Sequence, residues 1–136
     1  GLHLQDGSGL SRQNYVSADF FCRFLDAMMD SPSYGIFLYS LPSPGGNGTL
    51  SYNMKGQPEN LRNRIKVKSG SMNGVRCYTG YILPSGTEIQ DGYDILSEEV
   101  RSRIIVFSIL TNNCTSPTWK VRPLLDKIMV AIASSY

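Results

Sequence analysis

Lys68, Ser69 and Gly70 are the residues of this 136-residue chain whose types and spacing point most directly to chemistry. A lysine ammonium supplies a point charge and a serine hydroxyl supplies a hydrogen-bond donor, a pair that suits the binding of a carboxylate. Glycine has no side chain, so the backbone of a peptide can come close to it. The triplet therefore predicts a site for the carboxylate of a peptide. The alternative is an ordinary turn between two strands, without such a role.

Three other kinds of functional site are excluded, because the sequence does not supply the residues that they require. A Ser-His-Asp triad needs a placed histidine, and His3, the only histidine, lies near the start of the sequence. The Gly-x-Ser-x-Gly of a nucleophile elbow is absent, although Gly7-Ser8-Gly9 is present. The glycine-rich segment 45–48 lacks the Lys-Ser/Thr ending of a phosphate loop. Without Cys-x-x-Cys and with one histidine, the sequence predicts no zinc site.

Four segments that include this triplet occur in one order: Asp6-Gly7-Ser8-Gly9-Leu10-Ser11-Arg12, Gly48-Thr49-Leu50, Lys68-Ser69-Gly70 and Thr79-Gly80-Tyr81-Ile82. Lys-[Ser/Thr]-Gly is the third signature of serine enzymes that process penicillin or D-alanyl-D-alanine peptides. Together the segments resemble the C-terminal part of the D-alanyl-D-alanine carboxypeptidase/endopeptidase family known as penicillin-binding protein 4. The resemblance covers residues 5–83 and 103–135. It implies an α+β fold, with an antiparallel sheet flanked by helices as in the C-terminal part of the penicillin-recognising fold.

The resemblance also implies a role for each residue around the triplet. Lys68 and Ser69 would bind the terminal carboxylate of a D-Ala-D-Ala stem peptide, and the backbone N–H of Ser71 would belong to an oxyanion hole. The strand edge at residues 69–72, which includes Gly70, would pair with the peptide as an added strand.

A side pocket is implied as well. Leu10, Arg12 and Met72 would line it and would receive the side chain on the acyl side of the substrate. The planar fork of Arg12 suits a carboxylate there. The alternative is that Arg12 is a surface arginine, while Leu10 and Met72 serve packing.

The nucleophile of such an enzyme is absent from this sequence. The same signature set requires Ser-x-x-Lys and Ser-x-Asn, and no serine here has a lysine three positions later. Ser51-Tyr52-Asn53 and Ser71-Met72-Asn73 match Ser-x-Asn by letter, but the resemblance places the functional motif upstream of Asp6. We therefore expect residues 1–136 to be a partial transpeptidase-like domain of a larger enzyme, whose missing N-terminal half is its partner.

Residue periodicity predicts the elements that must position these side chains. Ser17 is the expected N-cap of the first helix. The predicted helical segments are 18–30, 34–41, 93–100 and 117–134. The predicted strands are 64–68, with the triplet closing it, 75–83 and 103–110, the last apolar on both faces and so expected to be central. Pro123 should kink the final helix or delay its start. Its expected inward residues are Trp119, Leu124, Leu125, Ile128, Met129 and Ile132.

Composition excludes several classes of function. Hydrophobic residues make up 41% and charged residues 18%, which is typical of a globular domain and not of a disordered one. A net charge of +2 is too small to indicate nucleic-acid binding, and no apolar run has the length of a membrane helix. Cys22, Cys77 and Cys114 cannot all pair with one another and are expected to be mostly buried thiols.

The resemblance implies a periplasmic or cell-surface hydrolase that needs no metal or cofactor. Its full-length form would bind peptidoglycan peptides and β-lactams. The alternative from another class is a non-catalytic module that binds cell-wall peptides or a protein. A Ser-x-x-Lys upstream would decide for the enzyme. A β-lactamase or esterase of the same fold would share the triplet but not the segment from Asp6 to Arg12. We also expect self-association through the edge of the 103–110 strand, because its neighbours would come from the missing half.

Overall fold

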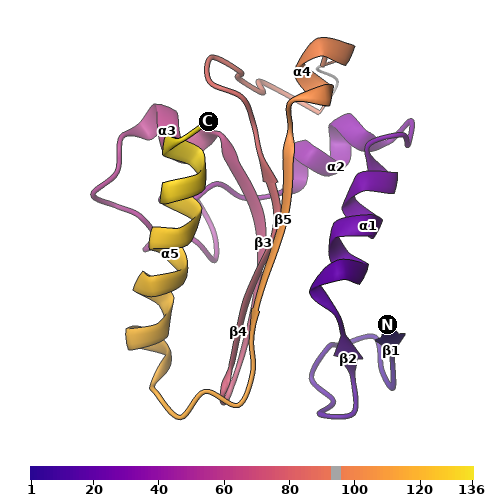
Figure 1. The fold of residues 1–136 in the computed structure, drawn as a ribbon, viewed down its shortest axis with the longest axis vertical. Helices are drawn as coiled ribbons and strands as arrows, with labels where there is room; N and C mark the ends of the chain where they lie inside the picture. Colours follow the sequence, from indigo (N-terminus) through magenta and orange to yellow (C-terminus); the bar gives the residue numbers. More distant parts are fainter. Residues whose placement is uncertain (93–95) are drawn as a thin grey trace.

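A three-stranded antiparallel sheet lies between helices in the computed structural model, which describes residues 1–92 and 96–136 (Figure 1). The sheet has the order β3-β4-β5. Its strands are β3 (Ile65–Met72), β4 (Val75–Ile82) and β5 (Ile105–Thr111). A two-stranded antiparallel ribbon, β1 (Leu2–His3) and β2 (Tyr15–Val16), precedes the first helix. The predicted α+β fold is confirmed.

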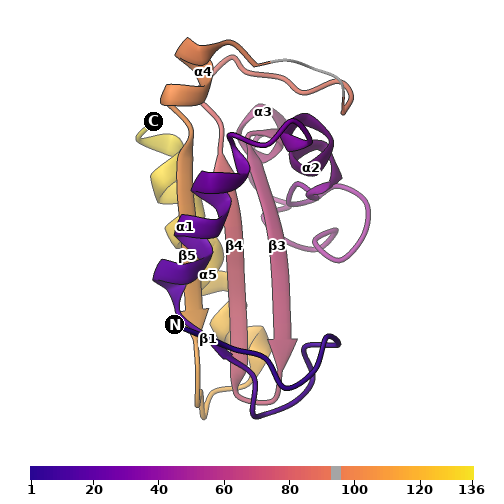
Figure 2. The ribbon, with the colours of Figure 1, turned by 90° about the vertical axis from the view of Figure 1, so that its right-hand side faces the viewer.

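The helices cover both faces of the sheet (Figures 1 and 2). On one side lie α1 (Ala18–Met28) and α2 (Tyr34–Ser40), and on the other lie α3 (Glu59–Asn63) and α5 (Thr118–Ser134). The short α4 (Glu98–Ser102) precedes β5. We call the two sides the α1 face and the α5 face. Each has its own apolar cluster, because successive residues of a strand point to opposite faces. Tyr81 packs in the cluster of the α1 face and Tyr78 in that of the α5 face.

A two-residue turn fixes how β3 pairs with β4. Asn73 and Gly74 connect the strands, and Gly74 has a φ of 76°, a conformation that favours glycine. The resulting register sets Lys68 opposite Thr79 and Ser69 opposite Tyr78. Because β3 continues to Met72, the triplet lies inside the strand, and the prediction that it closes the strand is wrong.

Several predicted elements are confirmed. The side chain of Ser17 accepts a hydrogen bond from the N–H of Phe20 and caps α1, as predicted. The segments predicted as helical at 34–41 and 117–134 correspond to α2 and α5. In the segment predicted at 93–100, a helix is found at α4, capped by Ser97, while residues 93–95 lie outside the described part of the chain.

Other expectations are wrong. The apolar strand at 103–110 is not central, because β4 is the middle strand and β5 pairs with β4 alone in the described sheet. Pro123 lies inside a helix that already begins at Thr118, so it does not delay the start. The sequence did not predict α3.

The inward face of α5 follows a four-residue repeat that differs from the predicted one. Leu125 and Met129 are buried as predicted, and Ile132 packs partly against the core. The prediction failed for Trp119, Leu124 and Ile128, whose side chains are 67%, 59% and 46% exposed. They lie outside the buried stripe, which also includes Val121 and Ala133.

The three cysteines are free thiols and only half-buried, so the prediction that they are mostly buried holds in part. Among the described helices, none combines the length and the apolar character that crossing a membrane requires.

The outer edge of β5 has no strand partner among the described residues. The N–H of Leu83 donates to the carbonyl of Arg64 at 2.9 Å. The backbone N–H and C=O groups of odd-numbered β4 residues therefore point toward β3, and those of even-numbered residues point toward β5. By register with β4, the even-numbered residues of β5 direct their backbone N–H and C=O groups away from the sheet. These residues are Val106, Ser108 and Leu110. An open edge of this kind is a template for strand pairing.

We therefore predict that the isolated chain self-associates at micromolar concentration. Ser108→Pro removes one outward N–H without removing a bond to β4, and it should shift sedimentation toward the monomer. Ser108→Thr keeps the N–H and serves as the control. A monomeric wild-type chain whose Val106, Ser108 and Leu110 amides exchange slowly with solvent would contradict the prediction.

Candidate functional site

Beyond Val67, the outer edge of β3 has backbone N–H and C=O groups that point away from the sheet. The N–H of Val67 points away from β4 and donates to the carbonyl of Pro42 at 3.0 Å. Because direction alternates along a strand, the backbone groups of Ser69 and Ser71 also point outward. No strand covers β3 on this side within the described part of the chain. The segment predicted to receive a peptide, residues 69–72, thus has the free edge that strand addition requires.

The side chains of Lys68 and Ser69 point to opposite faces of the sheet. Lys68 is exposed on the α1 face, where its ammonium donates to the Ser69 carbonyl at 2.8 Å. Ser69 lies on the α5 face, beside Tyr78. The two predicted carboxylate-binding groups therefore do not converge from one side. Each lies on the edge strand, so a ligand along that edge can reach one from each face.

Gly70 makes room for a neighbouring thiol. A Cβ at this position would lie 2.6 Å from the Sγ of Cys77, its partner on β4, which is closer than atoms can pack. Burial raises the pKa of the Cys77 thiol, although the nearby charges of Arg76 and Lys68 act in the other direction. A side chain at position 70 would therefore need the Cys77 thiol to move, independently of the predicted role of Gly70 in the approach of a ligand.

The loop that carries Leu10 and Arg12 is closed at its base by a polar pair. The Asn14 amide donates to Asp6 at 2.7 Å, and its oxygen accepts from the N–H of Gln5 and of Asp6. The hydrogen bond from Asn14 is the main reason that the pKa of Asp6 is lowered. This loop lies on the α1 side, at the end of the molecule where β3 finishes (Figures 1 and 2).

The predicted side pocket is only partly assembled. Leu10 is 71% exposed at the loop tip, and Arg12 is exposed and forms no hydrogen bond or ion pair with the described residues. Met72 is half-buried at the end of β3. The structure therefore brings residues 68–72 together on one strand, and it holds Leu10 and Arg12 on a separate loop at the same end.

Sequence reasoning missed a buried polar cluster behind β3 and β4. Asn53 is 1% exposed, and its amide nitrogen donates to the Tyr78 hydroxyl and to a carboxylate oxygen of Asp126, each at 2.8 Å. Burial raises the pKa of Asp126, and the hydrogen bond from Asn53 counteracts part of that effect. Asn53 belongs to the segment that matched Ser-x-Asn by letter. The available signal was Asp126, a carboxylate next to the apolar stripe of α5.

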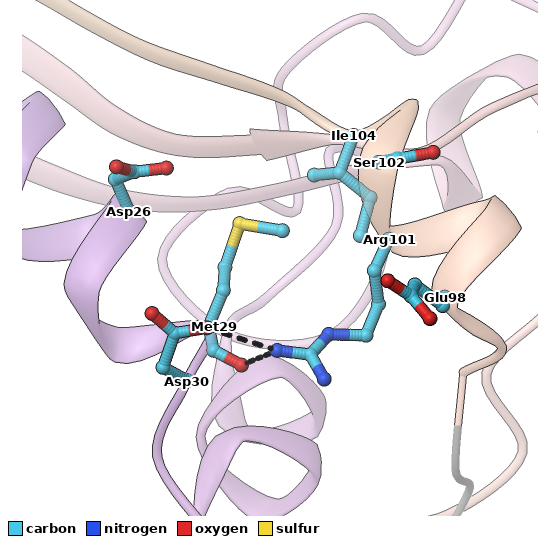
Figure 3. Close-up of a pocket in the computed structure, with 7 residues that line it drawn as sticks. All are labelled: Asp26, Met29, Asp30, Glu98, Arg101, Ser102 and Ile104. Atoms are coloured by element: carbon cyan, nitrogen blue, oxygen red, sulfur yellow. Dashed lines mark hydrogen bonds and ion pairs between the residues drawn. The ribbon is translucent and has the colours of Figure 1, made fainter.

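A cavity of about 440 Å³ lies away from this site, between the end of α1 and α4 (Figure 3). Its lining residues are Asp26, Met29, Asp30, Glu98, Arg101, Ser102 and Ile104. The Arg101 guanidinium donates to the Met29 carbonyl and pairs with Asp30 at 3.5 Å, so its charge ties α4 to the end of α1. The described residues contain no cluster of histidine, cysteine and acidic side chains that could hold a metal ion.

Comparison with known proteins gives consistent matches. The model of the D-Ala-D-Ala carboxypeptidase 3 (S13) family matches residues 1–134. A penicillin-sensitive carboxypeptidase A of Dictyostelium discoideum is 30% identical over 130 residues, which cover 93% of this chain and 22% of that protein. A D-alanyl-D-alanine carboxypeptidase of Actinomadura sp. is 37% identical over 87 residues, or 60% of this chain and 16% of that protein. The chain thus spans about a fifth of the length of these relatives.

We predict that the polar cluster is a main source of stability. Asn53→Leu leaves the Tyr78 hydroxyl and the Asp126 carboxylate short of a buried partner, and it should lower the free energy of unfolding by about 2–4 kcal/mol. Denaturant unfolding followed by circular dichroism measures this loss. Asn47→Leu, at an exposed asparagine of the preceding loop, should change stability little. Equal effects of the two substitutions would contradict the prediction.

Proposed function

Since the chain belongs to the D-Ala-D-Ala carboxypeptidase 3 family, we propose that it is part of a serine-type carboxypeptidase/endopeptidase of the penicillin-binding protein 4 type. The substrate would be the stem peptide of peptidoglycan, so the compartment would be the periplasm or the cell surface. One observation carries the proposal: Lys68, Ser69, Gly70 and Ser71 follow one another on an edge strand that no other described strand covers on its outer side.

The substrate peptide would pair with β3 beyond Val67. Lys68 and Ser69 would bind its terminal carboxylate from the two faces of the strand, and the outward N–H of Ser71 would donate to the oxygen of the scissile carbonyl. A serine elsewhere in the longer enzyme would attack the penultimate D-Ala carbonyl. The C–N bond would break, terminal D-Ala would leave as the amine, and water would hydrolyse the ester to regenerate the serine.

The loop from Asp6 to Asn14 would supply specificity. With Leu10 and Arg12 exposed at its tip and Met72 at the end of β3, a side chain on the acyl side of the substrate would be received between the two segments. Arg12 has a free guanidinium fork, which suits a carboxylate on that side chain.

A second candidate follows from the absence of Ser-x-x-Lys in this chain. A non-catalytic module would use the same β3 edge to bind cell-wall peptides or a protein without cleaving them. The sequence of the full-length gene separates the two candidates, because an upstream Ser-x-x-Lys would support the enzyme and its absence would support the module.

We predict that residues 1–136 alone form no covalent adduct with penicillin, because the nucleophile that would open the β-lactam ring lies outside this chain. Labelling with a fluorescent penicillin, followed by a denaturing gel, tests this. The full-length protein, treated in parallel, should give a labelled band. A band on the isolated chain would show that it contains a nucleophile after all.

We further predict that Lys68→Ala in the full-length enzyme slows acylation by a D-Ala-D-Ala peptide much more than it lowers thermal stability. The loss of a charged hydrogen bond to the carboxylate should cost about 2–4 kcal/mol of transition-state binding. Lys68 is exposed, so the melting temperature should change little. Lys127→Ala, at an exposed lysine of α5, is the matched control. An acylation rate unchanged from wild type would refute the role of Lys68.

A further inference from the structure

Arg76 is a half-buried cation without a carboxylate partner. The ion pairs formed by the described residues are Arg23–Asp19 and Arg101–Asp30, and neither includes Arg76. Its Nη2 donates to the Tyr78 hydroxyl at 2.9 Å, and its Nε is buried without a hydrogen-bond partner. A partly desolvated guanidinium is costly unless an anion compensates its charge. The Asp126 carboxylate is near enough to interact electrostatically with Arg76, but no carboxylate of the described residues lies within ion-pair distance of it, so the guanidinium can still pair with an external anion.

The strand register places Arg76 on the same face as two free hydroxyls. Arg76 is the cross-strand partner of Ser71, and Tyr78 is that of Ser69. Cross-strand partners point to the same side of a sheet, so all four side chains lie on the α5 face. Because its guanidinium reaches the Tyr78 hydroxyl, the Arg76 side chain extends from the residue paired with Ser71 toward the residue paired with Ser69. Neither serine hydroxyl has a hydrogen-bond partner among the residues that the structure describes.

These positions separate two parts of the carboxylate site. Lys68 can reach a carboxylate at the strand edge only from the α1 face, whereas the hydroxyls of Ser69 and Ser71 reach it from the α5 face. We propose that Arg76 supplies the positive charge on that face and contributes to selectivity for peptides that end in a free carboxylate. The proposal rests on the proposed function, and it adds a residue that the Lys-Ser-Gly triplet does not contain.

The buried cluster behind the sheet positions this arginine. The Tyr78 hydroxyl receives hydrogen bonds from Arg76 and from Asn53, and Asn53 is in turn bonded to Asp126 on α5. The guanidinium also lies over the Tyr78 ring, with 5.2 Å between its carbon and the ring centroid. The Arg76 side chain is therefore held against Tyr78 before any ligand arrives, which lowers the entropy lost on binding.

The test compares two peptides with the full-length enzyme, an N-acylated D-Ala-D-Ala with a free C-terminal carboxylate and the same peptide as the C-terminal amide. Arg76→Gln keeps an amide donor for Tyr78 and removes the charge. It should lower kcat/KM for the free acid at least ~10-fold and leave that for the amide nearly unchanged. Arg76→Lys keeps a charge and should retain part of the selectivity. Arg103→Gln removes an exposed charge near α4 and should leave both values unchanged.

Each outcome decides a different question. A wild-type enzyme that cleaves acid and amide equally well would overturn the proposed carboxylate site as a whole. A selective wild type, together with a folded Arg76→Gln variant that loses activity equally on both peptides or on neither, would overturn the role of Arg76 alone. Failure of both Arg76 variants to fold would make Arg76 a structural residue and would overturn the proposal too.

Discussion

The pairing of β3 with β4 is the constraint on which the rest of the site depends. The Asn73-Gly74 turn sets this register, and Gly80 lets the two strands lie close, since a Cβ there would lie 2.0 Å from the Lys66 carbonyl oxygen. A slip of one residue would exchange every side chain between the two faces. Lys68 would then point toward α5, and Ser69 would leave the side of Arg76. The pairing of β3 with β4 therefore determines which side chains of β3 point to each face of the sheet.

The two faces of the sheet are held in different ways. On the α1 face, the Tyr81 hydroxyl donates to the Leu25 carbonyl at 2.8 Å and anchors α1 over β4. On the α5 face, the Asn53 amide donates to the Tyr78 hydroxyl and to Asp126, and so ties a loop and a helix to the sheet. Two tyrosines of one strand thus fix the layers on opposite sides of the sheet.

Much of the framework was predictable from the sequence, because its signals are local. The cap at Ser17, the alternation in β3 and the four-residue repeat of α1 depend on near neighbours in the chain. Strand order was not predictable in this way, because it depends on residues that are distant in the chain. An apolar strand such as β5 is central or at an edge according to which strands pair with it. The exposure of Trp119 likewise depends on which stripe of α5 meets the sheet, and two apolar stripes compete for that position.

The candidate site divides in the same way. The triplet was visible as letters, but the opposite directions of Lys68 and Ser69 follow only once both are known to lie within one strand. The cluster around Asn53 joins residues 73 positions apart, and no short motif records such a contact. The Pro42 carbonyl has a further consequence, because it occupies the edge of β3 at Val67 and leaves only the residues beyond it free. An added peptide must stop or turn away at that point, so under the proposed function the Pro42 carbonyl would limit how far the carboxyl end of the peptide extends along β3.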